Sequence, residues 1–228
     1  GALLAVFTVT HYFAAEPVVR RVWPQMLISW TRATTGGFTG PTVGTALLAG
    51  GGGFAASVWI NQFTGSLRFF TSRAPLPAEI SWDAVGSTAG VVGVVADQVP
   101  IQLFAALLYT MVLVLLRMFT RSRVIAGIGF VIIVGGTIVA TTAGREFGIT
   151  TGLLTAALWL VLLLRAGLLA LVTAKILSAV FLQFPVTMNT SQVHATPSLA
   201  LMGLVCLVLL WAFVQSVGTR GLSTSGKD

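Results

Sequence analysis

Charged side chains are scarce in this chain, and their scarcity excludes a soluble fold. Only 8% of the residues are Asp, Glu, Lys or Arg, whereas 56% are hydrophobic. Soluble domains carry about 25% charged residues. Each transmembrane helix takes about 20 residues plus a connection, so the 228 residues allow six or seven spans. The composition therefore predicts an all-α fold, a polytopic transmembrane helical bundle with the bilayer as its surroundings.

Acidic residues, histidine and cysteine are also few, and this removes most catalytic and metal chemistry. The chain has six Asp and Glu, two His and one Cys. His11 and His194 are far apart, and neither an HExxH nor a complete GxSxG motif occurs. The glycine run 50–53 resembles a phosphate loop, but no Lys-Ser or Lys-Thr follows it. The sequence predicts no catalytic residue, no metal site and no cofactor.

The longest apolar stretch, residues 148–184, does not fit the membrane as one helix. It would be about 55 Å long at 1.5 Å per residue, against a hydrocarbon core of about 30 Å. Arg165 is the charge nearest its middle, and Gly167 follows closely. We therefore predict a tight turn at a membrane surface, joining neighbouring antiparallel spans at 148–164 and 166–184.

The remaining apolar runs predict the rest of a single membrane domain, residues 1–217. A first run at 1–14 is too short to span alone, and Pro17 is expected to end its helix. Because the chain opens without Met or a basic leader, we expect the native protein to continue upstream. The other predicted elements are spans at 41–62, 100–118, 124–141 and 198–217, a polar connection at 63–83, a re-entrant or interfacial segment at 84–98 and a polar tail at 218–228.

Residues 18–34 mix arginine, tryptophan and apolar residues, a composition typical of a helix lying among lipid headgroups. The residues that suggest this position are Arg20, Arg21, Trp23, Trp30 and Arg32. We expect one amphipathic interfacial helix here.

The basic residues lie in the connections between spans, which predicts an orientation and not nucleic-acid binding. On one side the expected connections hold Arg20, Arg21, Arg32, Arg117, Arg121, Arg123, Arg165, Arg220 and Lys227, and on the other only Arg68, Arg73 and Arg145. The richer side is expected to face the cytoplasm, together with the C-terminus.

Two features inside the spans allow alternative interpretations. Lys175 lies near the middle of the sixth span, where a lysine costs about 2.5–3.5 kcal/mol. We expect it to face other helices and to contact carbonyls, hydroxyls or an acid, with Asp97 the first candidate. The glycine run 50–53 permits either close helix contact or a broken helix lining a cavity. Together they motivate an alternative hypothesis, a small transporter or carrier subunit.

Two segments of the chain resemble a known family. Residues 16–32 read Glu-Pro-Val-Val-Arg-Arg-Val-Trp-Pro-Gln-Met-Leu-Ile-Ser-Trp-Thr-Arg. This resembles a signature, Glu-Pro-x-x-Arg-Arg-x-Trp-Pro leading into Leu-Ile-Ser-Trp and an Arg, in the C-terminal membrane region of bacterial eukaryote-like serine/threonine protein kinases. A weaker match covers Arg-Ala-Gly-Leu-Leu-Ala-Leu at 165–171 and Phe-Pro-Val-Thr at 184–187. The residues of the interfacial motif are Glu16, Arg20, Arg21, Trp23, Trp30 and Arg32.

The chain also departs from the family, whose first motif is usually followed by Asp-Pro-x-Val-Gly-Arg-Asp. Here only Pro41-Thr42-Val43-Gly44 remains. The resemblance implies a non-catalytic membrane anchor and candidate sensor in the bacterial inner membrane, with a cytoplasmic kinase domain upstream as partner. None of the kinase motifs occurs in these 228 residues, and the resemblance leaves homo-oligomerisation open.

Overall fold

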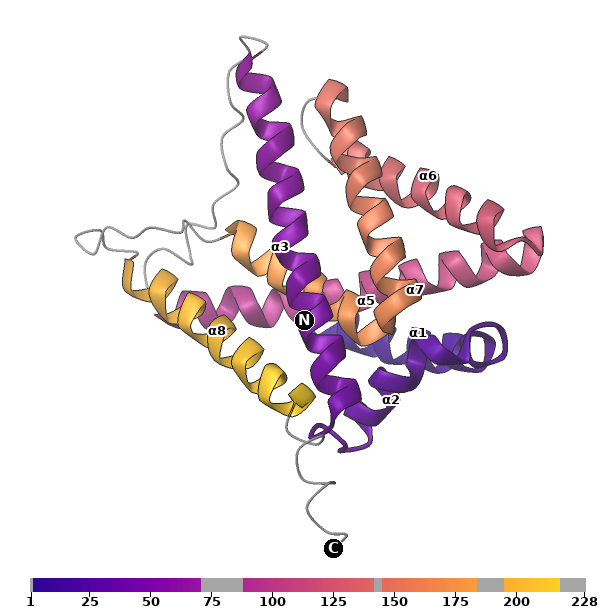
Figure 1. The fold of residues 1–228 in the computed structure, drawn as a ribbon, viewed down its shortest axis with the longest axis horizontal. Coiled ribbons are helices and arrows are strands. Elements are labelled where there is room, and N and C mark those ends of the chain that lie inside the picture. Colours follow the sequence, from indigo (N-terminus) through magenta and orange to yellow (C-terminus); the bar gives the residue numbers. More distant parts are fainter. Residues whose placement is uncertain (1, 71–87, 142–144, 184–194, 218–228) are drawn as a thin grey trace, which may run out of the picture.

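The computed structural model describes residues 2–70, 88–141, 145–183 and 195–217, and these ranges contain helices and no strand (Figure 1). The elements are α1 (Ala2–Val22), the 3₁₀ turn η1 (Pro24–Leu27), α2 (Ile28–Thr34), α3 (Pro41–Phe70), α5 (Thr88–Thr120), α6 (Arg123–Thr141), α7 (Arg145–Gln183) and α8 (Ala195–Val217). Five of them, α3, α5, α6, α7 and α8, are long and apolar enough to cross a membrane. The predicted all-α polytopic bundle is therefore confirmed. The predicted tail and residues 71–87 lie outside the described residues.

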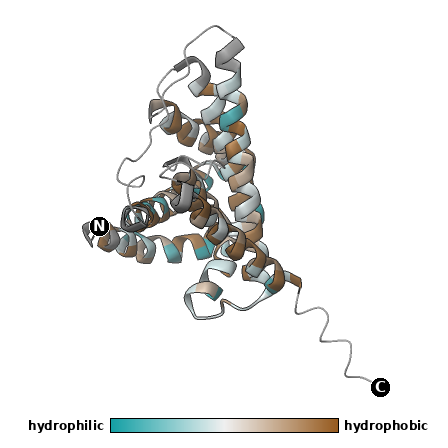
Figure 2. Ribbon diagram, turned by 90° about the vertical axis from the view of Figure 1, so that its left-hand side faces the viewer, coloured by the Kyte–Doolittle hydropathy of each residue, from teal (hydrophilic) through white to brown (hydrophobic). Residues whose placement is uncertain are grey.

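α7 is the centre of the bundle, because it contacts α3, α5, α6, α2 and η1, while α8 packs against α3. Leu163, Leu168 and Leu171 of α7 are fully buried and belong to the main hydrophobic core. By contrast, only 11% of the α8 span is buried, against 56% of the α7 span. Hydrophobic residues colour the helices brown on many faces in Figure 2. Such apolar exposure indicates contact with a lipid bilayer.

α7 bends at Gly167, as the sequence predicted. Its backbone there has φ 84° and ψ −173°, a conformation essentially restricted to glycine. We call residues 145–166 the first leg of α7 and residues 168–183 the second leg. The legs remain neighbours as far as Trp159 and Lys175, and Figure 1 shows them spreading apart from the bend. The tight turn is thus confirmed, whereas close antiparallel packing holds only near it.

The prediction that Pro17 ends the first helix is wrong, because α1 continues through it to Val22. A proline removes one backbone hydrogen bond, but ending the helix there would leave several backbone groups unpaired in an apolar environment. Glu16 and Arg20 form an ion pair of 2.6 Å one turn apart, which supports the helix across the proline.

The single amphipathic helix expected over 18–34 is also wrong. These residues divide into the end of α1, η1 and α2. The break falls at Trp23, whose backbone is not helical (φ −148°, ψ 69°). Trp23 and Met26 are buried in the main core, so burial of their side chains outweighs the continuous amphipathic helix that the composition suggested.

Two further boundaries differ from the sequence prediction. Residues 88–98 are not a separate re-entrant segment, because α5 runs without interruption from Thr88 through Pro100 to Thr120. α3 extends eight residues beyond the predicted end at 62, to Phe70. Polar residues near a helix end therefore concealed its true length in both places.

The bend yields a test of the fold. A Cβ on residue 167 would lie 2.8 Å from the Met26 carbonyl oxygen, and the backbone conformation itself costs a non-glycine residue roughly 1–3 kcal/mol. Gly167→Ala should therefore lower the unfolding temperature in detergent. Gly136→Ala is the matched control, because nothing lies within 4 Å of its new methyl group. Equal unfolding temperatures for the two variants would contradict this account of the bend.

Candidate functional site

Lys175 lies inside the bundle and faces aromatic rings. Its Nζ is 4.6 Å from the ring centroid of Tyr109 on α5 and 5.8 Å from that of Trp159 on the first leg of α7. Both distances are within the range of a cation–π interaction. Lys175 thus faces other helices, as expected, but its described partners are aromatic faces in place of carbonyls, hydroxyls or an acid.

The expected pair between Lys175 and Asp97 is not formed. Asp97 is exposed on α5 and makes no ion pair with any part of the chain that the structure describes. Tyr109, which lies under the lysine, is three turns further along the same helix, about 18 Å from Asp97 at 1.5 Å per residue. The two charges are therefore at different depths in the bundle.

Tyr109 and Trp159 were not singled out from the sequence. Trp159 is 4% exposed, and Tyr109 also packs edge-on against Phe130 of α6 with 6.2 Å between ring centroids. A spacing signal existed for Trp159: it precedes Gly167 by eight residues and Lys175 follows Gly167 by eight. Once a bend is expected at Gly167, equal spacing places both residues at one depth.

The glycine run of α3 serves close helix contact. A Cβ built on Gly50 would lie 2.6 Å from the Thr173 Cβ, and one on Gly51 would lie 2.5 Å from the Leu209 Cδ2. A Cβ on Gly53 would overlap the Leu162 Cδ1. These neighbours belong to the second leg of α7, to α8 and to the first leg of α7. The run therefore lets α3 touch three helical segments, the two legs of α7 and α8, in agreement with the packing interpretation.

A buried hydroxyl pair continues this contact one turn later. The hydroxyl groups of Ser57 on α3 and Ser178 on the second leg of α7 are 2.7 Å apart, and both residues are buried. Ser178 also donates to the Ala174 carbonyl oxygen. Small residues and a hydrogen bond between helices are typical of contacts inside membranes.

The charged residues of the interfacial motif are used in different ways. Glu16 pairs with Arg20 inside α1, and Arg21 is exposed. The Arg32 Nη1 donates to the Thr42 hydroxyl over 2.7 Å. This bond joins α2 to the first turn of α3, so Arg32 closes the connection between the motif and the first long span.

The tryptophans of the motif face inward. Trp23 is 5% exposed in the main core. Trp30 is half-buried, and its ring lies 6.2 Å from that of Tyr12 on α1. The motif therefore places Trp30 of α2 beside Tyr12 of α1, and η1 lies against the bend of α7 through Met26 and Gly167. The structure thus brings the segments 16–32 and 165–171 into contact.

No group of three or more His, Cys, Asp or Glu side chains that suits a metal ion occurs among the residues described. What the site offers is a lysine ammonium held between two aromatic rings. This arrangement stabilises a cation inside the bundle.

A double-mutant cycle tests the aromatic contact of Lys175. Burying the ammonium costs about 2.5–3.5 kcal/mol, while a cation–π contact returns about 0.5–2 kcal/mol. Lys175→Leu should therefore raise the free energy of unfolding in detergent. Tyr109→Leu should destabilise the native chain more than the Lys175→Leu chain, with a coupling of about 0.5–2 kcal/mol. A coupling of zero would show that the ring does not hold the ammonium.

Comparison of this chain with protein families, with curated proteins and with solved structures gives no match.

Proposed function

We propose that this chain is the membrane anchor and candidate sensor domain of a receptor-like bacterial serine/threonine protein kinase, non-catalytic in itself. The observation that carries the proposal is the contact between η1 and the bend of α7, where a Cβ on Gly167 would lie 2.8 Å from the Met26 carbonyl oxygen. The two segments that resemble the kinase membrane regions meet there. Their contact supports a structural role for both segments.

We further propose that the ends of α1 and α8 face the cytoplasm of a bacterial inner membrane. Arg20 and Arg21 lie in the last turn of α1 and Arg32 in the last turn of α2. Arg165 lies at the bend of α7. An excess of arginine beside short connections supports a cytoplasmic position. A Cβ on Gly44 would lie 2.8 Å from the Ser216 backbone nitrogen, so the end of α8 and the start of α3 share one side of the bundle.

The alternative is a small transporter or carrier subunit, for which the buried Lys175 is the favouring observation. A transport role requires the lysine to exchange partners during a cycle. Its position over the rings of Tyr109 and Trp159 supports a structural role, which favours the anchor. The native gene ahead of residue 1 separates the two: a glycine-rich loop, a strand lysine and an HRD-type catalytic loop would establish the kinase, and their absence would remove it.

Cysteine labelling tests the proposed orientation independently of the kinase. In a Cys206→Ser background, Arg21→Cys should react with an impermeant maleimide only after the cells are permeabilised. Ser66→Cys is the control, because Ser66 is exposed near the opposite end of α3 and should react in intact cells. Labelling of Arg21→Cys from outside would reverse the orientation.

A further inference from the structure

A cavity of about 490 Å³ lies beside the bend of α7. Its wall comes from η1 and α2, from the first turns of α3 and from the bend itself. The polar residues of the wall are Gln25, Ser29, Thr42, Thr45 and Arg165, and the remainder is apolar apart from backbone. The wall contains no acidic residue.

Ser29 provides a buried hydroxyl that faces this cavity. The residue is 5% exposed and lines the wall. Its Oγ lies 3.4 Å from the position that a Cβ on Gly167 would take, so the hydroxyl is directly beside the bend. A serine hydroxyl can donate one hydrogen bond, so Ser29 is suited to donate to a bound acceptor.

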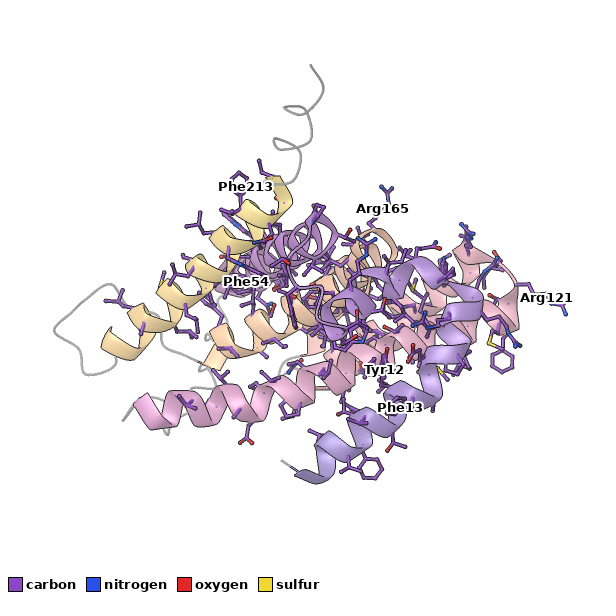
Figure 3. The ribbon with its side chains drawn as sticks, turned by 90° about the horizontal axis from the view of Figure 1, so that it is seen from below. Tyr12, Phe13, Phe54, Arg121, Arg165 and Phe213 are labelled. Carbon is purple, nitrogen blue, oxygen red and sulfur yellow. The ribbon has the colours of Figure 1, made fainter. Side chains whose placement is uncertain are left out.

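Two arginines make this region positive. Arg165 is exposed at the rim, and Figure 3 shows its side chain projecting away from the helices. It makes no ion pair with the described residues. Arg32 lies beside the wall, because its Nη1 donates to the hydroxyl of the lining residue Thr42. Guanidinium and hydroxyl donors without a carboxylate favour a phosphate group.

The depth of the cavity indicates the source of the phosphate. The apolar stretch Gly148–Phe181 has 34 residues, and the bend divides it into legs of about 28 Å and about 21 Å. The first leg is close to the thickness of the hydrocarbon core, about 30 Å. The bend therefore lies at headgroup depth. Ile28 and Leu164, which line the apolar part of the wall and are exposed, can contact acyl chains.

From these observations we propose that the cavity binds the phosphate of an anionic phospholipid headgroup. Arg165 pairs with the phosphate at the rim, and the Ser29 hydroxyl donates to one of its oxygens within the cavity. The inference concerns lipid binding alone and does not depend on the kinase.

The test is a lipid titration of the full chain in detergent, followed by native mass spectrometry. Phosphatidylglycerol should bind at least about tenfold more tightly than phosphatidylcholine, because it adds net negative charge opposite Arg165. Arg165→Gln should weaken phosphatidylglycerol binding about tenfold and Ser29→Ala about threefold. Arg165→Lys, which keeps the charge, should recover part of the loss.

Arg123→Gln is the matched control. Arg123 is exposed at the start of α6 and does not line the cavity, so its loss should change binding by less than about twofold. Equal effects of Arg165→Gln and Arg123→Gln, at unchanged unfolding temperatures, would overturn the site. Equal binding of both lipids, with Arg165-dependent binding of inorganic phosphate, would assign the cavity to free phosphate and overturn the lipid.

Discussion

The bend of α7 at Gly167 is the constraint on which the arrangement of the other helices depends. The apolar stretch of α7 is too long to cross the membrane once, and the bend folds it back on itself. The bend also places Leu162 and Thr173 where α3 can touch both. The same bend receives η1 against its backbone. Any residue larger than glycine would alter the backbone angle and the contact with η1 together, so the bend and the packing of the N-terminal segment form one unit.

The glycine run of α3 is the second feature on which the packing of the helices depends. Hydrophobic burial does not draw helices together in lipid, because the acyl chains are equally apolar. Contact must instead come from close approach, and Gly50 and Gly53 allow it on the two legs of α7. The Ser57–Ser178 hydrogen bond then satisfies two buried hydroxyls at the same interface.

Much of the fold was predictable, because the bilayer fixes how many apolar residues a helix needs. The spans at 124–141 and 198–217 correspond to α6 and α8, and the bend followed from Arg165 and Gly167. The sequence misplaced Asp97 because composition does not give the depth of a residue along a helix. It also missed the burial of Trp23, since an arginine-rich neighbourhood looks interfacial whichever way the ring points. The rings around Lys175 depend on the rotation of three helical segments, which no local pattern determines.

α8 illustrates what sparse burial means for a membrane helix. Its 11% buried span meets α3 at Gly44 and Gly51, and acyl chains solvate most of the remaining circumference. In energetic terms α8 is solvated mainly by lipid, and only the side that faces α3 is packed against protein. Its position therefore depends on the acyl chains around it as much as on its contacts with α3.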